Sequence, residues 1–259
     1  MNRFDGKKAV VTGGTHGIGM AVVKALLDGG AEVLLTGLNE ENIQAARREL
    51  GSTAHVLRSD AASMADIDAL GKAVEDTFGQ VDFVFVNVGF IRFDPLDKVT
   101  EDTYDKMFAV NTKGAFFTAQ RLAPLVSEGG SFVFTTAVVT GLGFVATSVG
   151  TGMKAAIRAF TRVFAAELLP RHIRVNAVSP GFTQTPTMGI AGISDELRAA
   201  NQSEGEEMTP MGRFGSPEEV AAAVLFLGFD ATFTTGIELA VDGGLSQGLE
   251  TPHGEVVTH

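Results

Sequence analysis

The sequence has no cysteine, which excludes a disulfide framework, a thiolate nucleophile and a sulfur-ligated metal site. It also lacks long apolar runs, because no stretch approaches the roughly 20 residues needed to span a bilayer. Positive charge is scarce, and the formal net charge of −11 argues against a nucleic-acid partner. The polar start, Met1 to Lys8, has no signal-peptide core. We therefore expect a cytoplasmic protein with no membrane partner.

Hydrophobic residues make up 45% of the chain, which is enough to bury a sizeable core. Short β-branched runs alternate with longer segments of helical periodicity, as in a parallel sheet with crossover helices. The expected strands are Lys8–Thr12, Glu32–Thr36, His55–Arg58, Phe83–Asn87, Ser131–Thr135, Arg174–Val178 and Glu238–Val241. The pattern predicts an α/β fold: a Rossmann-type, doubly wound parallel sheet of about seven strands with helices on both faces.

No linker, repeat or low-complexity tract divides the chain. We therefore predict a single domain over residues 1–248 and a polar C-terminal tail over 249–259. The one long irregular stretch, about 183–213, is rich in glycine, threonine, methionine and glutamate and is predicted to be a lid-like segment. Ser63 and Ser216, each followed three residues later by an acid, are expected helix starts.

A glycine cluster follows the first expected strand and opens the first expected helix. Glycines there let backbone N–H groups approach a pyrophosphate, and the helix N-terminus adds partial positive charge. The alternative is a tight turn that binds no ligand, but the strand before it and the amphipathic helix after it favour dinucleotide binding. The candidate cofactor-binding residues of this turn are Gly13, Thr15, His16, Gly17, Ile18 and Gly19.

The TGxxxGxG spacing of this turn resembles the classical short-chain dehydrogenase/reductase (SDR) family, and further blocks agree with it in order over nearly the whole chain. These blocks are Asp60-Ala61, Asn87-Val88-Gly89, Asn111, the segment from Pro180-Gly181 through Thr183 and Thr185, and Val241-Asp242-Gly243-Gly244. Valines at positions 86 and 88 depart from the family pattern. The resemblance implies an NAD(P)-binding oxidoreductase that forms a homotetramer through the helices near 103–126 and 152–169.

The resemblance also implies roles for these blocks. Asp60 and Ala61 lie against the adenine, Asn111 kinks a helix, and the segment after Pro180 holds the nicotinamide. At the end of the second strand an acid would select NAD(H) and an arginine NADP(H). The chain has Gly37 and Leu38 there, followed by Asn39. Nothing repels a 2′-phosphate, and only His16, Thr36 and Asn39 could donate to it, which favours NADP(H) slightly over NAD(H).

Family members carry a serine, a tyrosine thirteen residues later and a lysine four residues after that. The tyrosine exchanges the proton as hydride moves, and the serine orients the carbonyl oxygen. Lys154 matches the lysine, which places Gly150 and Ala137 at the tyrosine and serine positions. The sole tyrosine, Tyr104, is expected to be a packed or surface aromatic.

Asn111 and Lys154 therefore remain as the candidate catalytic residues, and together with a water in the emptied space they could relay a proton. Phe90, Phe144 and Val145 are candidates to line that space. No spacing typical of a metal site is present.

Four hypotheses stay open. The first is an NAD(P)(H)-dependent oxidoreductase that acts on a small carbonyl or alcohol by a non-standard proton path. The second is a non-redox enzyme, such as a dehydratase, isomerase or cyclase, and the third is a cofactor-binding protein without catalysis. The fourth is an ordinary reductase mutated on purpose. The first is favoured because so much of the cofactor site persists.

Overall fold

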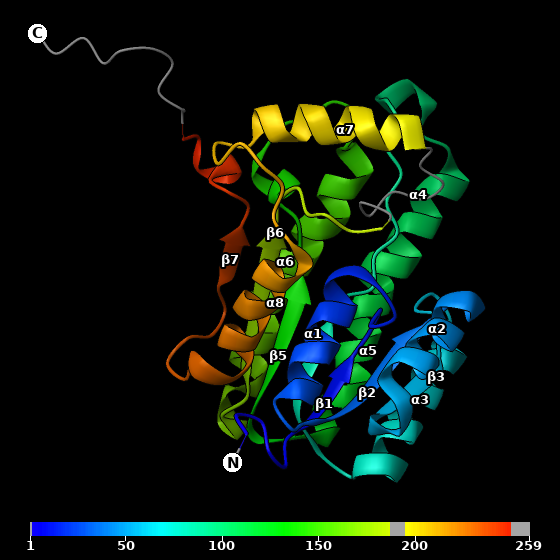
Figure 1. Cartoon of the computed structure of the whole chain (residues 1–259), viewed down its shortest axis with the longest axis vertical. Helices are drawn as coiled ribbons and strands as arrows, with labels where there is room; N and C mark the ends of the chain where they lie inside the picture. The colour runs from blue at the N-terminus through cyan, green and yellow to red at the C-terminus, as the bar shows by residue number, and fades with distance from the viewer. Residues whose placement is uncertain (1, 187–194, 250–259) are drawn as a thin grey trace, which may run out of the picture.

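Seven parallel strands form one sheet in the computed structural model, which describes residues 2–186 and 195–249 (Figure 1). Their order across the sheet is β3-β2-β1-β4-β5-β6-β7. The bounds are β1 Lys8–Val11, β2 Glu32–Gly37, β3 Ala54–Arg58, β4 Val81–Val86, β5 Val126–Thr135, β6 Arg174–Pro180 and β7 Glu238–Val241. The predicted fold class and all seven expected strands are confirmed.

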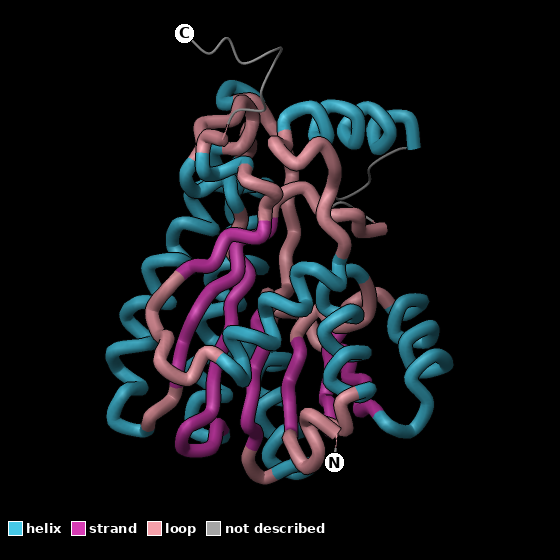
Figure 2. Tube along the Cα trace, turned by 60° about the vertical axis from the view of Figure 1, so that its left-hand side comes forward, coloured by secondary structure: helices cyan, strands magenta, loops and turns pink. Residues whose placement is uncertain are grey.

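Helices cover both faces of this sheet (Figure 2). Their bounds are α1 Gly17–Asp28, α2 Glu40–Leu50, α3 Met64–Phe78, α4 Glu101–Phe108, α5 Gly114–Leu122, α6 Ser148–Leu168, α7 Asp195–Met208 and α8 Pro217–Leu225. Helices α1, α2 and α8 contribute to one hydrophobic core, and α3, α5 and α6 contribute to a second. The sheet therefore separates two layers of helices.

Alternation along the strands produces these two cores. Ala9 and Val11 of β1 belong to the first core, whereas Val10 between them belongs to the second. Successive side chains of a strand point to opposite faces, so a strand covered on both faces must be apolar throughout. This is why the strands are recognisable in the sequence as short uninterrupted apolar runs.

The ends of one strand differ from the prediction. β5 begins at Val126, earlier than the expected Ser131. The intervening residues are polar or glycine and carry no strand pattern, yet Val126 pairs with Val81 of β4. The register shifts between Val81 and Phe83, so the extra length of β5 is an irregular extension of the sheet.

Both expected helix starts are confirmed. The Ser216 side chain accepts from the backbone N–H of Glu219, and the Glu219 carboxylate accepts from the backbone N–H of Ser216, which makes a complete capping box. Ser63 caps α3 in the same way by accepting from the backbone of Asp66. The Asp66 carboxylate, however, accepts from the backbone of Asp60, so this second cap also fastens the loop after β3.

Helix α7 lies inside the stretch that was expected to be irregular, and that expectation is wrong for residues 195–208. The segment consists largely of good helix formers such as glutamate, alanine and arginine. It has few apolar residues, so no stripe of helical period reveals it. Residues 187–194 of the expected lid lie outside the described part of the chain. α7 crosses above the carboxyl ends of the strands (Figure 1).

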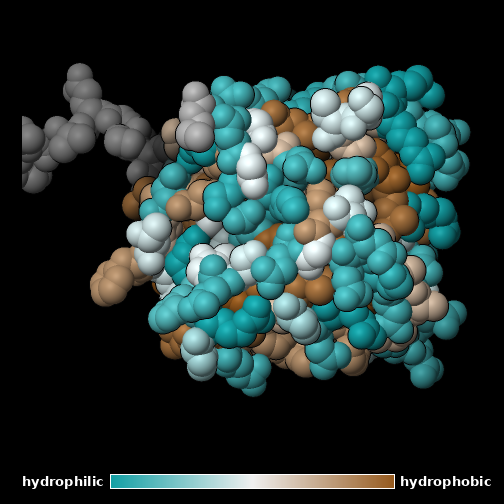
Figure 3. Space-filling model, turned by 90° about the horizontal axis from the view of Figure 1, so that it is seen from below, coloured by the Kyte–Doolittle hydropathy of each residue, from teal (hydrophilic) through white to brown (hydrophobic). Residues whose placement is uncertain are grey.

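The opposite end of the molecule, near the N-terminus, presents mainly hydrophilic side chains with smaller hydrophobic areas between them (Figure 3). Among the helices that the structure describes, none combines the length and apolar character needed to cross a membrane. The glycine-rich turn and the loops after β4, β5 and β6 meet at the other end, beneath α7 (Figure 1).

Candidate coenzyme-binding and catalytic site

The turn between β1 and α1 is a cradle that side chains would fill. Gly13 has a φ of +64°, which favours glycine, and a Cβ there would lie 3.3 Å from the Cα of Val88. A Cβ at Gly14 would lie 2.7 Å from the Cβ of Leu35, and one at Gly19 would lie 2.1 Å from the carbonyl oxygen of Gly13. The close approach of backbone at Gly13 and Gly19, and of the Leu35 side chain at Gly14, therefore favours glycine at these positions.

The N-terminus of α1 opens onto this cradle without a protein cap. His16 precedes the helix in an extended conformation and makes no capping hydrogen bond through its side chain, and the first turn holds no acidic residue. The first N–H groups of a helix need acceptors and carry partial positive charge. An anionic group fits here, so the residues present suit the pyrophosphate of a dinucleotide.

A chain of hydrogen bonds connects the cradle to the candidate lysine. The Asn87 side-chain amide donates to the carbonyl oxygen of Gly13 over 3.4 Å, and Thr135 Oγ1 donates to Asn87 Oδ1 over 2.9 Å. Lys154 Nζ donates to the carbonyl oxygen of Thr135 over 2.9 Å. The Asn87 backbone N–H is in turn fixed by Thr12 Oγ1 at 3.0 Å. Loop, strand ends and helix α6 are therefore held as one unit.

Lys154 is the central cation of this unit. Its side chain is 3% exposed, and the ion pairs within the described residues do not include it. Burial without a carboxylate partner disfavours the charged form and lowers the pKa of Lys154 to about 8. A lysine with this pKa can hold a proton at neutral pH and release it more readily than an exposed lysine.

Asn111 fixes the loop that follows β4. Between α4 and α5 the chain forms a π-helical turn over Ala109–Lys113. This turn agrees with the helix kink that the resemblance implies, and such turns are frequent at functional sites. Asn111 Nδ2 donates to the carbonyl oxygens of Phe90 at 2.7 Å and Met107 at 2.8 Å, while Oδ1 accepts from the Phe90 N–H at 3.2 Å. Both amide protons are engaged, so Asn111 can accept from a water but not donate to one.

Ala137 lies two residues after the end of β5, and Gly150 lies in the first turn of α6. Ala137 follows Thr135 by two residues in extended backbone, so the two side chains share a face. Gly150 is buried one helical turn before Lys154, and a Cβ there would meet only Met107 Cε at 3.9 Å. The site therefore accepts a side chain at position 150 without backbone strain.

The corner after β2 bears on coenzyme choice. A Cβ at Gly37 would lie 2.5 Å from Thr15 Cγ2, so any side chain at position 37 would require Thr15 to shift. Thr36 is buried and accepts from the Gly13 N–H at 3.3 Å, and its expected role as a phosphate donor is not supported. Asn39 Oδ1 caps α2, which leaves its Nδ2 free to donate.

His16 and Leu38 complete this corner. Desolvation lowers the pKa of the His16 imidazole below its ordinary value, so at neutral pH His16 offers an uncharged N–H group and not a cation. Leu38 is 52% exposed and offers no polar atom.

The candidates for contacts with adenine and with nicotinamide follow β3 and β6 respectively. Asp60 Oδ1 accepts from the Ala62 N–H at 2.9 Å, while the Ala61 carbonyl oxygen would lie 2.4 Å from a Cβ at Gly114. On the other side, Pro180 ends β6. Thr183 Oγ1 donates to the carbonyl oxygen of Gly181 at 3.1 Å.

Thr185 connects the segment after β6 to the cradle. Its Cγ2 would lie 3.3 Å from a Cβ at Gly17, and Gly17 has a φ of +55°. The predicted glycines of the cradle, Asn87, Gly89, Asn111, Lys154 and Thr185 are therefore close neighbours in the structure.

A groove of about 400 Å³ lies beside the first turn of α6. Its walls contain no charged residue and are formed by Pro95, Leu96, Leu142, Gly143, Phe144, Val145, Ala146, Thr147, Ser148 and Thr151. Phe144 and Val145 line this groove, which does not include Ala137 or Gly150, so their expected place beside the emptied space stays a prediction; the Phe90 ring lies beneath the ammonium of Lys106, 4.6 Å from it. Tyr104 stacks on Phe108 with ring centroids 4.6 Å apart and is 46% exposed, which confirms its interpretation as a surface aromatic.

Sequence reasoning missed Thr12 and Thr135, which carry the hydrogen bonds between cradle and lysine. The available signal was the alternation along β5, which places Thr135 on the same face as Ala137. In the described part of the chain, histidine and acidic side chains do not gather in threes or more where they could hold a metal ion.

The fold and this arrangement define a dinucleotide-binding α/β protein. A family model described as enoyl-(acyl carrier protein) reductase matches residues 13–246. Oxidoreductase asL5 of Sarocladium schorii is 36% identical over 257 residues, which cover 95% of this chain and 98% of that protein. The 3-oxoacyl-(acyl-carrier-protein) reductase FabG of Chlamydia pneumoniae is 32% identical, with 93% and 97% covered.

Among solved structures, a short-chain dehydrogenase/reductase (glucose/ribitol dehydrogenase) from Brucella melitensis superimposes with a TM-score of 0.86 at 29% identity, over 94% of this chain and 98% of that one. The chain belongs to the short-chain dehydrogenase/reductase family.

Proposed function

We propose that this protein is an NAD(P)(H)-dependent oxidoreductase of small carbonyl or alcohol compounds in which Ala137 and Gly150 occupy the usual serine and tyrosine positions. The observation that carries the proposal is the continuous hydrogen-bond path from the phosphate cradle through Asn87 and Thr135 to the buried Lys154. A protein without coenzyme chemistry would not need a buried, unpaired ammonium at the end of that path.

The proton path differs from that of the family because Gly150 offers no phenol. A bound nicotinamide coenzyme supplies or accepts the hydride. Lys154 holds the proton at Nζ, and only one of its three N–H groups is used by Thr135. A water between Lys154 and the substrate oxygen carries the proton as the alkoxide forms. Asn111 Oδ1, an acceptor, orients that water.

The groove beside α6 indicates the kind of substrate. Its exposed walls include Leu96, which is 84% exposed, and Val145, which is 89% exposed. Such surfaces favour an apolar substituent, and the absence of a charged residue in the lining disfavours an ionised one. We therefore propose an uncharged carbonyl compound with an apolar group as the substrate.

The coenzyme is proposed to be NADP(H) in slight preference to NAD(H). Positions 37 and 38, at the corner after β2, are glycine and leucine, so neither of them repels a 2′-phosphate. His16 and the Asn39 amide are the donors there, and neither is cationic at neutral pH, which limits the preference to a small factor.

Separate titrations with NADH and NADPH test the proposal, followed by turnover assays with the tighter binder across uncharged ketones, aldehydes and alcohols. We expect saturable binding of at least one coenzyme and slow, measurable oxidation of it with an apolar carbonyl compound. Absence of binding for both coenzymes would exclude the proposal, and binding without turnover would leave a coenzyme-binding protein without catalysis.

The Thr135 hydroxyl provides a first mutational test. Thr135→Val removes the donor to Asn87 Oδ1 and keeps the carbonyl that accepts from Lys154. Leaving the amide oxygen without its partner costs about 1 kcal/mol, so the coenzyme Kd is expected to rise about fivefold.

Thr136→Val is the matched control. The Thr136 hydroxyl is buried and donates to the carbonyl oxygen of Val178 over 3.0 Å on the opposite face. We expect Thr136→Val to lower the melting temperature about as much as Thr135→Val does. Unlike Thr135→Val, it should leave the coenzyme affinity unchanged. Equal affinities for both variants would argue against the polar path as part of the coenzyme site.

We also propose that the chain self-associates, in line with the homotetramer that the resemblance implies. A second hollow of about 440 Å³ on the outer side of α4, α5 and α6 is lined largely by Phe108, Phe116, Phe117 and Phe160. Val163 of α6 is 53% exposed. Light scattering should give a mass in solution of four chains, and a Phe116→Asp variant is expected to reduce it; a monomeric wild type would contradict the proposal.

A further inference from the structure

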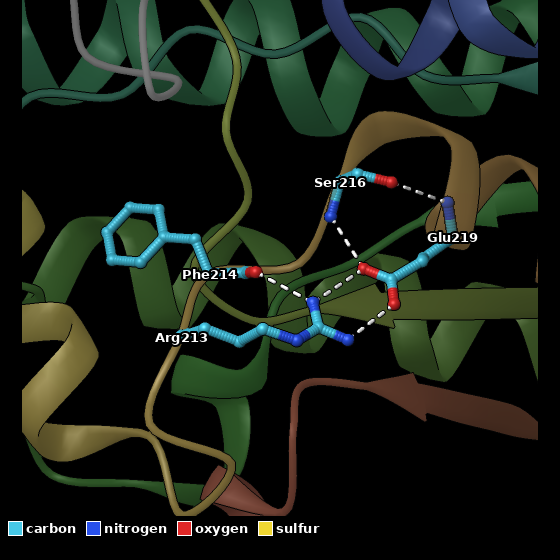
Figure 4. A network of polar contacts seen from close by, with 4 residues as sticks. All are labelled: Arg213, Phe214, Ser216 and Glu219. Atoms are coloured by element: carbon cyan, nitrogen blue, oxygen red, sulfur yellow. Dashed lines mark hydrogen bonds and ion pairs between the residues drawn. The ribbon is translucent and has the colours of Figure 1, made fainter.

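Arg213, in the loop between α7 and α8, forms a bidentate ion pair with Glu219 of α8 (Figure 4). The two guanidinium nitrogens donate to the carboxylate over 2.9 and 2.7 Å, and one of them also donates to the carbonyl oxygen of Phe214 over 2.9 Å. Glu219 further accepts from the Ser216 N–H over 2.8 Å. These hydrogen bonds lower the pKa of Glu219 to about 2, so the pair stays charged at neutral pH.

Gly215 lies between the two paired residues in the sequence. Its backbone is hydrogen-bonded to the segment that follows β6. The Gly215 N–H donates to the carbonyl oxygen of Phe182, and the Gln184 N–H donates to the carbonyl oxygen of Gly215, both over 2.9 Å. The buried Phe214 ring stacks on Phe182 with centroids 5.3 Å apart. Fixing the backbone on either side of Gly215 therefore fixes residues 182–184.

That same segment contacts the phosphate cradle. Thr185, the next residue, packs against Gly17. At its other end, Gly181 lies so close to β7 that a Cβ would sit 2.8 Å from the Cα of Asp242. One short segment thus connects the ion pair to the turn that is proposed to hold the coenzyme.

We propose that Arg213 and Glu219 are positioning residues for the coenzyme, acting through Gly215 on residues 182–185. This inference rests on the proposed function. Exposed ion pairs contribute little to overall stability, and the two side chains are 51% and 45% exposed. The contribution of this pair is instead the local order of a segment that would otherwise open independently of the core.

Arg213→Gln tests the inference in the full-length protein. In the coenzyme-free state, hydrogen exchange of peptides covering 182–185 and 215 is expected to speed up about tenfold, while exchange in β1 and β5 stays unchanged. The dissociation constant for the better-bound coenzyme, NADH or NADPH, is expected to rise roughly threefold to thirtyfold. The melting temperature should change by no more than it does when another exposed ion pair, such as Arg121–Asp68, is removed.

Two further variants serve as controls. Arg213→Lys keeps the charge but cannot reproduce the two-pronged contact, so it should restore affinity only in part. Arg121→Gln removes the exposed ion pair with Asp68 on the other side of the sheet and should leave exchange at 182–185 and coenzyme affinity unchanged.

The outcomes separate the two proposals. If the wild type binds neither coenzyme, the proposed function fails and this inference fails with it. If the wild type binds and Arg213→Gln binds equally well, only the inference is overturned. Faster exchange throughout the sheet would also overturn it, because the pair would then be a general stabilising contact.

Discussion

Lys154→Met is expected to make the protein more stable and to remove its activity. A pKa lowered from the ordinary value of 10.5 to about 8 corresponds to about 3 kcal/mol of destabilisation by the buried charge. The lost hydrogen bond to the Thr135 carbonyl offsets about 1 kcal/mol of the gain. We therefore expect a net stabilisation of about 2 kcal/mol at pH 7 and a fall in kcat of at least about 10²-fold.

The stability difference between Lys154→Met and the wild type should depend on pH, because Lys154 titrates at a different pH in the folded and unfolded protein. The folded protein releases the Lys154 proton at a lower pH than the unfolded chain does, so the unfolded chain binds more protons between pH 8 and 10.5. Wild-type stability should rise across that window because of this group, and the penalty is complete below it. The penalty should accordingly shrink as the pH increases from 8 and vanish near 10.5, so the advantage of Lys154→Met ends below pH 10.5, where the remaining penalty equals the contribution of the lost hydrogen bond, about 1 kcal/mol.

Denaturant unfolding of both proteins at several pH values measures this difference. Lys72→Met, which removes an exposed lysine paired with Asp76, is the control and should change stability little at any pH. If wild-type turnover is seen, it should also decline above pH about 8 as the proton donor is lost. A Lys154→Met variant with unchanged stability and unchanged turnover would refute both the buried charge and its role.

The fold was predictable because the physical cause of each element is local. Strands such as β1 are apolar on both faces, and the glycines of the cradle stand between a strand and an amphipathic helix. Lys154 was singled out because the helix around it resembles the family, and the structure buries it near Gly89; its catalytic role stays a prediction. These features depend on residues near one another in the sequence, so pattern and structure agree.

The contacts that hold the site together could not be predicted in the same way. Thr135 is an ordinary strand residue by composition, and its partner Asn87 lies 48 positions away. Arg213 and Glu219 look like common surface charges until the backbone bonds of Gly215 are seen. The helix α7 has too few apolar residues to show a period. Long-range polar contacts and polar helices leave no periodic signal for sequence reasoning to use.

If Ala137 and Gly150 occupy the usual serine and tyrosine positions, as proposed, introducing those two side chains should produce the largest gain in activity. The double variant Ala137→Ser, Gly150→Tyr is expected to raise kcat for reduction of an apolar ketone by about 10² to 10⁴-fold, the usual contribution of a positioned general acid. The serine would share a face with Thr135, and the tyrosine would begin one helical turn before Lys154. A phenol there also places a hydrogen-bond partner beside the buried ammonium.

A control variant with the tyrosine at position 152 separates proton transfer from the effects of added bulk and of helix propensity. A Cβ at Gly152, like one at Gly150, would meet a single atom at 3.9 Å, so Ala137→Ser, Gly152→Tyr has the same composition and a similar gain in helix propensity. Only the variant at 150 places the phenol one turn from Lys154. Steady-state kinetics should show the gain in that variant alone, mainly in kcat, because the new group acts on the reacting oxygen and not on coenzyme binding. If both double variants bind coenzyme and neither gains turnover, proton transfer is not what limits the reaction, and the hypothesis that Gly150 replaces the catalytic tyrosine is wrong.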